Sequence, residues 1–590
     1  MRMKASSRLP ALLALVLGCG TVLAGELTFV FETRLNDRPL ILDESTGTNA
    51  VGQVVSVGRF DWLLSEIRLH SEDNGWQTTS RESFFISGGK GRTRFSMTHA
   101  PDGQFDRLSF RIGLNPETNA ADPASYGPAH PLNAVLNGLH WSWQGGYVFL
   151  ALEGKWTDPK TLQSGGYSYH LGNDHMRMIV DLPLALTLPT DRPVKLQLNL
   201  DTVFGGPAPF AFGADTASTH GRKGDPLAAK LQTNIVAAFS AEWIDPTPIA
   251  PPGQPAESIV LINPDATPYR FTFGRQFPPP RLPRDNPLTE EGVALGRSLF
   301  HDPLLSLTKT QSCASCHQPD AGFVDSGRAF SLGAEGSPGT RNTMPLFNLA
   351  WKERFFWDGR AASLREQVLM PIQNPIEMHE SLPRVVAKLE AAGYSTRFKA
   401  AFGSPEINPD RVARALEQFV LTIISHDSKF DRAMRGKATL TDLEKQGFLL
   451  FNTEYDPRRG LYGADCFHCH GGPLFSNNGF TDNGLDETYR DRGLALHTGR
   501  KQDEGRFAVP SLRNVELTSP YMHDGRFRTL EEAVAHYGGG VRPSPSLDPN
   551  LAKHPVGGVP LPLTQQQALV AFLKTLTDEQ FRAESSDGRF

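Results

Sequence analysis

The sequence predicts a multidomain protein with an N-terminal all-β, sandwich-like domain, a proline-rich linker and a mainly α-helical C-terminal part. Apolar and polar residues alternate in the first part, prolines cluster after it, and apolar residues then recur at helical spacing. A chain of 590 residues has room for several domains. We place the β domain at 25–245, the linker at 246–283, and two helical modules at 284–440 and 441–590.

Period-two alternation is the signal for the β domain. Leu27, Phe29 and Phe31 alternate with polar neighbours, and Leu196 and Leu198 do the same much later. Clusters of Gly, Pro, Asn and Asp separate these runs, as turns do between strands. The pattern predicts antiparallel strands arranged as a sandwich.

The first 24 residues have the features of a secretory signal peptide. A basic start is followed by a leucine-rich run too short to span a bilayer, then by Val22-Leu23-Ala24 before the cleavage position. We therefore expect a periplasmic protein, with a lipid anchor on Cys19 as the alternative. No other segment predicts a membrane span, and a net charge of −5 argues against a nucleic-acid partner.

Two CxxCH pentapeptides hold four of the five cysteines. Two thiols at this spacing add to the vinyl groups of haem, and the following His supplies the proximal nitrogen to iron. Structural zinc is the alternative, although zinc sites usually pair CxxC motifs at closer spacing. We expect two covalent c-type haems in two cytochrome c-like modules, bound through Cys313, Cys316 and His317, and through Cys466, Cys469 and His470.

The helical part is internally duplicated. Trp357-Asp-Gly-Arg matches His523-Asp-Gly-Arg at an offset of 166, and the same offset places Pro371 opposite Tyr537. A Tyr phenolate can ligate iron, whereas Pro has no ligating side chain. The residues alone leave two interpretations: Tyr537 closes the second iron while the first stays open, or Tyr537 is an ordinary packed or exposed side chain.

Glu377 follows Pro371 by six residues. A carboxyl beside an open iron can move a proton between the two oxygens of hydrogen peroxide, which promotes O–O cleavage. A surface or helix-capping Glu is the alternative interpretation.

Residues 277–590 resemble the bacterial diheme cytochrome c peroxidase family, specifically its MauG-type branch. The resemblance is carried by both CxxCH motifs, Phe356-Trp-Asp-Gly-Arg, Pro371-Ile-Gln-Asn-Pro and Tyr521-Met-His-Asp-Gly. It implies that His317 is the proximal ligand of a high-spin haem. It further implies that Glu377 is the distal acid–base residue, with Gln367 and Pro371 lining its pocket.

The same resemblance implies roles in and around the second module. His470 and Tyr537 would ligate a low-spin haem, and Trp357 would relay electrons between the haems. A calcium ion would lie between the modules, held by Asn342 and by the carbonyl groups of Ala508 and Pro510.

Two departures from the peroxidase branch separate the relatives. That branch has Met where Tyr537 stands, and a His after the first CxxCH that caps the resting iron. This chain has no His between His317 and His379. Both departures favour the branch that stores two oxidising equivalents and oxidises a protein side chain.

Residues 26–245 resemble the MbnP family of periplasmic copper-binding proteins, through His140-Trp-Ser-Trp143 and Tyr169-His170 among other stretches. In that family a MauG-type partner, MbnH, converts one tryptophan to kynurenine near the copper. On the residues alone, core aromatics and surface histidines are the favoured explanation of these stretches. The candidates for modification are Trp141 and Trp143. Imidazole suits copper, and the candidate ligands are His70, His140 and His170, followed by His130 and His175.

Three hypotheses follow. In the first, the chain uses peroxide to oxidise a tryptophan of its own β domain, within one molecule or between two. In the second, it is a diheme peroxidase that takes electrons from an external periplasmic donor docked on the β domain. In the third, it is a copper-binding or electron-transfer protein without enzymatic activity.

Overall fold

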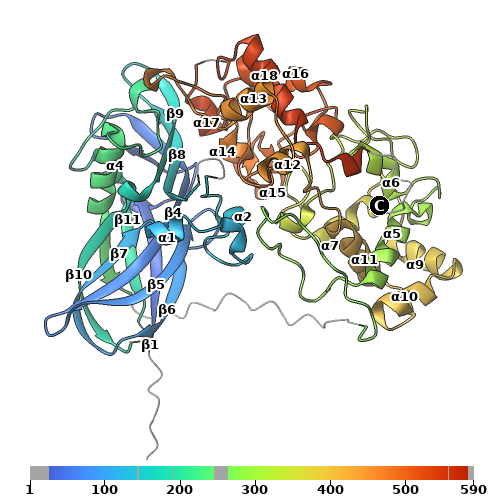
Figure 1. Cartoon of the computed structure of the whole chain (residues 1–590), viewed down its shortest axis with the longest axis horizontal. Coiled ribbons are helices and arrows are strands. Elements are labelled where there is room, and N and C mark those ends of the chain that lie inside the picture. Colours follow the sequence, from blue (N-terminus) through green and yellow to red (C-terminus); the bar gives the residue numbers. More distant parts are fainter. Residues whose placement is uncertain (1–24, 142–144, 191, 245–262, 556, 583–590) are drawn as a thin grey trace, which may run out of the picture.

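The computed structural model describes residues 25–141, 145–190, 192–244, 263–555 and 557–582 (Figure 1). The predicted leader with Cys19, the candidate Trp143 and the first prolines of the linker lie outside the described residues. None of the helices in the described part of the chain is long and apolar enough to cross a membrane.

The N-terminal domain consists of two β-sheets, drawn in blue to green in Figure 1. The smaller sheet has β1 (Gly25–Leu35), β2 (Arg38–Pro39), β6 (Arg94–Ala100), β11 (Val194–Asn199) and β13 (Phe239–Trp243). The larger sheet has β3 (Thr46–Thr48), β4 (Val54–Ser71), β5 (Gly75–Ser87), β7 (Gly103–Ile112), β8 (Val148–Thr157), β9 (Ser164–Gly172), β10 (Met178–Leu188) and β12 (Ser218–Thr219).

Alternating burial explains why these segments form a two-layered core. Along β10 every second residue is buried, while its neighbours such as Ile179 face outward. Trp62 lies in the middle of the core, with its ring against Phe31 and Phe239. Burial of such alternating apolar side chains is the main stabilising contribution, worth about 1.5–3 kcal/mol for each large one.

The prediction of antiparallel pairing holds for most strand pairs and is wrong for two. β1 pairs with β11 in parallel, with Phe29 opposite Val194, and β12 pairs in parallel with β9. Alternation of apolar residues reports which face is buried but not the direction of the neighbouring strand. A helix, α4 (Pro226–Ala237), also interrupts the strands, and Asp225 caps its first turn.

The C-terminal part is mainly helical and follows the first proline groups, as predicted. In the first module α5 (Glu290–His301) packs on α11 (Pro409–Leu421), and in the second α13 (Asp442–Phe451) packs on α18 (Leu563–Lys574). The remaining α-helices of this part are α6 (Cys313–Cys316), α7 (Leu364–Gln367), α8 (Met370–Gln373), α9 (Leu382–Ala391), α10 (Ser395–Phe402), α12 (Lys429–Met434), α14 (Phe467–His470), α15 (Ala495–Thr498), α16 (Leu530–Ala535) and α17 (Pro549–Ala552).

Each helix pair depends on a glycine at the crossing. A Cβ added to Gly296 would lie 1.9 Å from the carbonyl oxygen of Ala415, and one added to Gly447 would lie 1.9 Å from that of Ala568. Only a residue without a side chain allows helices to approach this closely. The two modules therefore share the same helix crossing.

The duplication extends to unusual backbone conformations. Asn348 and Asn514, which are 166 positions apart, have φ values of 60° and 56°. Phe356 and Met522, at the same offset, have φ values of 68° and 74°. Left-handed conformations are uncommon for residues other than glycine, so their repetition indicates two copies of one module.

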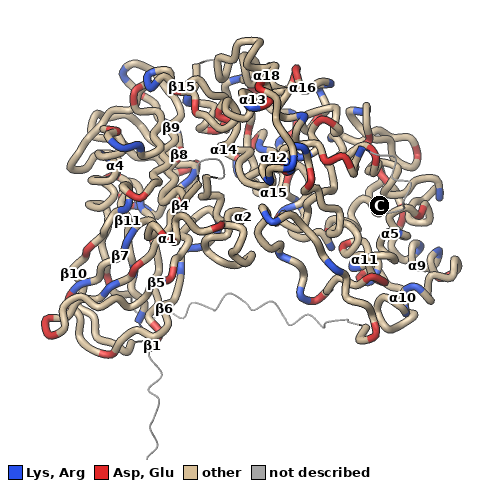
Figure 2. The backbone as a smooth tube through the Cα atoms, in the orientation of Figure 1, with Lys and Arg blue, Asp and Glu red and all other residues tan. Residues whose placement is uncertain are grey.

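The β domain packs directly on the second module. Figure 1 shows α17 beside β8 and β9, and a Cβ added to Gly166 on β9 would lie 2.0 Å from the carbonyl oxygen of Pro549. Polar contacts surround this close approach: Lys155 to the Pro545 carbonyl (2.8 Å), Arg506 to Asp43 (2.9 Å), Asn550 to Glu153 (2.9 Å) and Arg459 to Asp225 (2.8 Å). Figure 2 shows acidic and basic residues interspersed over both parts.

Candidate functional site

The first CxxCH motif forms the short helix α6. Ser312 and Ser315 form a capping box that fixes its first turn. The motif thiols are free rather than joined in a disulfide, and burial raises the pKa of Cys313 to about 12. Neutral, unpaired thiols at this spacing suit thioether bonds to haem.

The two histidines of the motifs are oriented in the same way. His317 Nδ1 lies 2.9 Å from the Phe323 carbonyl oxygen, and His470 Nδ1 lies 3.1 Å from that of Phe475. Burial lowers the pKa of both rings, that of His470 to about 4. Each imidazole is therefore neutral and donates Nδ1–H to a carbonyl, which leaves Nε2 to ligate a metal.

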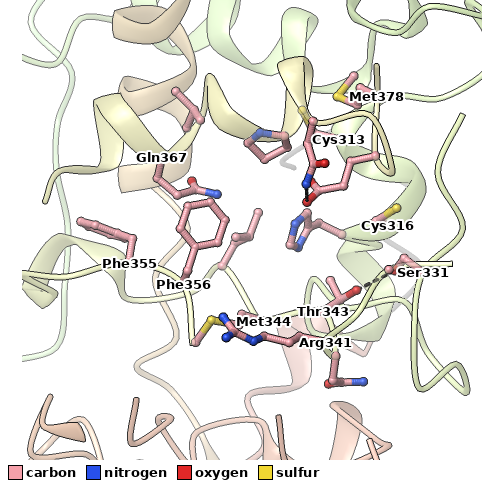
Figure 3. A pocket seen from close by; sticks show the side chains of 18 of the residues that line it. Cys313, Cys316, Ser331, Arg341, Thr343, Met344, Phe355, Phe356, Gln367 and Met378 are labelled. Atoms are coloured by element: carbon pink, nitrogen blue, oxygen red, sulfur yellow. Dashed lines mark hydrogen bonds between the residues drawn. The ribbon is translucent and has the colours of Figure 1, made fainter. Parts of the chain in front are cut away.

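A cavity of about 260 Å³ opens beside His317. Figure 3 shows Cys313 and Cys316 across it from Gln367, Phe355 and Phe356. The predicted pocket residues Glu377, Gln367 and Pro371 all line it, together with Trp357. Two thiols, an imidazole that lines the cavity and a largely apolar wall fit a c-type haem.

Glu377 is held at this cavity by its neighbour Asn374. The amide Nδ2 of Asn374 donates to Glu377 Oε1 at 2.7 Å. Burial raises the pKa of Glu377, and the hydrogen bond from Asn374 opposes the shift. A carboxyl with a raised pKa exchanges protons closer to neutral pH, as a general acid–base residue requires.

Trp357 connects the two modules. Its indole Nε1 donates to the Asn342 carbonyl at 2.8 Å, and its own carbonyl accepts from Ala508 N at 2.8 Å.

The predicted calcium residues Asn342 and Ala508 therefore flank Trp357. The Pro510 carbonyl lies beside the His470 ring. The Asn342 amide donates to the carbonyl groups of Arg328 and Ala329, at 3.3 and 3.2 Å.

Tyr537 lies half-buried near the second motif. Its hydroxyl accepts a hydrogen bond from Asn483 at 3.1 Å. Burial raises its pKa to about 12, and the nearby thiols of Cys469 and Cys466 add to the shift. It occupies a five-residue π-helical turn, a local form common at functional sites. Its role as an iron ligand stays a prediction.

Trp141 is buried where the β domain meets the second module. Its indole packs on Gly172, whose added Cβ would lie 2.6 Å from the ring, and its ring centroid lies 5.9 Å from that of His220. Trp141 lines a small cavity with Phe467 and His468, the two spacer residues of the second CxxCH motif. Trp141 lies outside the regular strands, and Gly145 and Gly146, both with positive φ, follow shortly after it.

The three histidines predicted first as copper ligands do not converge. His70 Nδ1 lies 2.6 Å from Asp106, and its ring lies against Trp76. His140 and His170 line the same cavity as Trp141. Of the reserve candidates, His130 stacks on Tyr126 and His175 is exposed. Among the described residues, neither His70 nor His140 belongs to a group of three potential ligands.

Sequence reasoning missed several residues of these sites. Asn374 and Asn483, which hold Glu377 and Tyr537, carry no motif that marks them. His468 was treated as a variable spacer inside CxxCH, although the structure places its ring 5.2 Å from that of His170. A large polar spacer where the first motif has Ala and Ser was the available signal.

Comparison with known proteins gives a family for each part. Residues 290–439 match the family described as di-haem cytochrome c peroxidase, and residues 24–220 match MbnP. The methylamine utilization protein MauG of Methylorubrum extorquens is 39% identical over 306 residues, covering 50% of this chain and 81% of that protein. The cytochrome c551 peroxidase of Nitrosomonas europaea is 36% identical over 302 residues, with 50% and 82% covered.

Among solved structures, the chain is similar to a MauG-like protein associated with microbial copper homeostasis, at 34% identity and a TM-score of 0.48. That similarity covers 54% of this chain and 98% of the other. The family match, the identity to MauG and the paired CxxCH sites together assign the C-terminal part. The chain therefore belongs to the MauG and di-haem cytochrome c peroxidase family, is a peroxidase-type oxidoreductase, and carries an MbnP domain at its N-terminus.

Proposed function

We propose that this protein is a periplasmic, peroxide-dependent oxidase whose substrate is Trp141 of its own MbnP domain. One observation carries the proposal: Trp141 is buried against the attachment motif of the second haem. The ring centroids of Trp141 and His220 are 5.9 Å apart, and those of His220 and Phe467 are also 5.9 Å apart. Two ring contacts therefore join the indole to the residue that follows Cys466.

These ring contacts suit oxidation of the indole by electron transfer to the second module rather than by direct reaction with peroxide. The cavity that holds Glu377 belongs to the first module, whereas Trp141 faces the second. Peroxide and indole would thus react at different places in one chain. The haems, when bound, supply the oxidation by peroxide and hold the two oxidising equivalents.

The residues around the first cavity have defined tasks in this proposal. His317, held by the Phe323 carbonyl, is the iron ligand on one side. Glu377 takes the proton from one peroxide oxygen and returns it to the other, so that water leaves. Asn374 positions the carboxyl, and Gln367 and Pro371 line the space beside it without offering an ionisable group.

The second haem would be held by His470 and Tyr537. Asn483 donates to the Tyr537 hydroxyl and so fixes the oxygen that would face iron. Trp357, bonded to both modules, is the side chain placed to pass an electron between them.

The proposed product is kynurenine. Two molecules of peroxide oxidise tryptophan to N-formylkynurenine: each peroxide gives one oxygen atom to the product and one molecule of water. Hydrolysis of N-formylkynurenine then releases formate. The side chain loses one carbon and gains one oxygen overall.

Calcium at Asn342, Ala508 and Pro510, and copper in the MbnP domain, belong to the same proposal. Of the predicted copper ligands, His140 and His170 line the Trp141 cavity, and of these two only His170 belongs to a group of three potential ligands among the described residues.

The deciding experiment is the intact mass of the full chain with both haems attached, before and after peroxide. Loss of one carbon and gain of one oxygen at Trp141, located by peptide mapping, is expected. The Trp141→Phe variant should react with peroxide but show no such mass change. An unmodified Trp141 in the wild-type chain after several equivalents of peroxide would rule the proposal out.

The runner-up is a diheme peroxidase that reduces peroxide with electrons from an external donor. The identity to cytochrome c551 peroxidase favours it as the second candidate. In that case a periplasmic electron donor would sustain turnover while every tryptophan keeps its mass.

A further inference from the structure

We infer that three imidazoles, His170 and His220 of the β domain and His468 of the second haem-attachment motif, form a metal site that bridges the two domains. One nitrogen from each ring lies within 4.8 Å of the other two. Three nitrogens on one ion lie about 3.4 Å apart at ordinary bond lengths of about 2.0–2.1 Å, so small side-chain rotations complete the site.

Two of these rings carry a buried nitrogen with no partner. Among the described residues, neither Nε2 of His220 nor Nδ1 of His468 has a hydrogen-bond partner. The side chain of His468 is only 1% exposed, so bulk water cannot supply the missing hydrogen bond. Unpaired buried polar atoms are costly and rare in folded proteins, and a bound ion satisfies them.

In two of the rings the opposite nitrogen faces a carboxylate: His220 Nδ1 lies 2.7 Å from Glu454, and His170 Nε2 lies 2.8 Å from Glu153. His468 differs, because its Nε2 accepts a hydrogen bond from the Lys553 ammonium at 3.3 Å and lies 3.6 Å from Asp465. This ring must release the Nδ1 proton to an incoming ion before Nδ1 can act as a ligand. Histidines that bind metals almost always donate their second ring nitrogen to a carboxylate or carbonyl, which orients the ring and strengthens it as a ligand.

Charged groups surround the three rings. The Lys553 ammonium pairs with Glu454 and Asp465, and His554 Nε2 lies 2.7 Å from Asp465. Arg59 pairs with Glu153, the carboxylate beside His170. Three carboxylates therefore lie around the rings beside two cations, Arg59 and Lys553.

The ligand set defines the class of ion. Neutral imidazoles without a thiolate suit first-row transition metals, and such sites bind copper more tightly than zinc. Three ligands leave one position open on a four-coordinate ion. Because one ligand comes from the haem module, the ion fixes the MbnP domain against that module, beside Trp141.

This inference does not depend on oxidation of Trp141, and its test uses no peroxide. The full chain with both haems attached is freed of loosely bound metal with a chelator, then titrated with copper(II) alone or zinc(II) alone. One copper, or one zinc, per chain is expected by elemental analysis. The copper form should show three imidazole nitrogens by X-ray absorption spectroscopy.

Variants test the bridging ligand. His468→Gln and His220→Gln should each weaken binding of copper at least about tenfold, as loss of a ligand does. His99→Gln, which removes an exposed imidazole of the same domain, should leave affinity unchanged. Haem content by absorbance shows that each variant is assembled.

Three results would overturn the inference. One is that neither metal binds the wild-type chain at one equivalent. Another is wild-type affinity in an assembled His468→Gln variant, since that would confine the site to the β domain. The third is fewer than three imidazoles around copper in the wild-type chain, which is decisive even if the variants fail to assemble.

Discussion

The two haem modules share their proximal side and differ on the opposite side. His317 and His470 are each held by a carbonyl five or six residues downstream, after similar short helices. Pro371 and Glu377 border an open cavity in the first module, whereas Tyr537, at the position equivalent to Pro371, lies half-buried near the second motif. Duplication has preserved the part that holds a haem and changed the part that decides what the haem does.

The spacers of the two motifs differ in the same sense. The first motif has Ala314 and Ser315, while the second has Phe467 and His468, whose rings contact the β domain. The first module therefore has room for a small oxidant, and the second presents bulky side chains to a protein partner. The following variants test whether this division is real.

Glu377→Gln should have the largest effect on the first module. Loss of a positioned acid–base group costs about 10²- to 10⁴-fold in rate, so the reaction with peroxide should slow by that factor in stopped-flow absorbance. Glu366→Gln, an exposed carboxyl on α7, is the matched control. Equal rates for the two variants would contradict the role of Glu377.

Tyr537→Phe tests the second module. Removal of the hydroxyl should change the absorption spectrum of that haem alone and lower the yield of oxidised Trp141 by about tenfold or more, since loss of even an outer-sphere partner costs 10- to 100-fold. Tyr521→Phe, which removes another half-buried hydroxyl of this module, should leave the spectrum unchanged. An unchanged Tyr537→Phe spectrum would show that the tyrosine is not a ligand.

Gly166→Val separates the β domain from the second module without touching either haem. The new side chain meets the Pro549 carbonyl, and such overpacking costs about 1–3 kcal/mol. Oxidation of Trp141 should fall, while the peroxide reaction at the first module keeps its rate. Gly88→Val, at an exposed glycine with no neighbour within 4 Å of the new Cβ, is the control. Full oxidation in the Gly166→Val chain would favour reaction between molecules.

Asn374→Ala should have the smallest effect. The hydrogen bond to Glu377 is worth about 1 kcal/mol, or roughly fivefold in rate. Because this bond opposes the shift caused by burial, its loss should raise the Glu377 pKa further. The limb of the pH–rate profile that reports Glu377 should therefore move to higher pH. The limb should vanish in Glu377→Gln.

The same raised pKa affects stability. A carboxyl whose folded pKa exceeds its unfolded value contributes stability below the unfolded pKa and loses it as pH rises through the folded value. The wild-type chain should therefore lose stability as the pH rises above 4.5, and Glu377→Gln should lose less. Thermal unfolding of both chains between pH 4 and 8 measures the difference. An identical pH dependence in both chains would contradict the shift.

Local patterns predicted much of the molecule. The CxxCH spacing and the offset of 166 located both modules, and period-two alternation identified the β domain. Strand direction could not be predicted, because β1 and β11 alternate identically whether parallel or antiparallel. The place of Trp141 against the second module could not be predicted either, because it depends on how the two domains dock.

The meeting of His170, His220 and His468 was out of reach for a different reason. His220 and His468 are separated by the linker and the whole first module, and the near neighbour of His468, His470, is itself the predicted haem ligand. Their proximity follows from the docking of two domains, which depends on Gly166 and on ion pairs such as Arg459 to Asp225. No local pattern encodes such a contact.

The burial of Trp141 between covalently joined domains has a consequence for stoichiometry. A separate substrate protein can leave and be replaced, but an indole enclosed within its own polypeptide is present once. Each molecule would then make a single product in its lifetime, and the modification would work as an irreversible maturation step rather than as turnover. If peroxide reacts with the haems after that event, another electron donor must reduce them, or they stay oxidised.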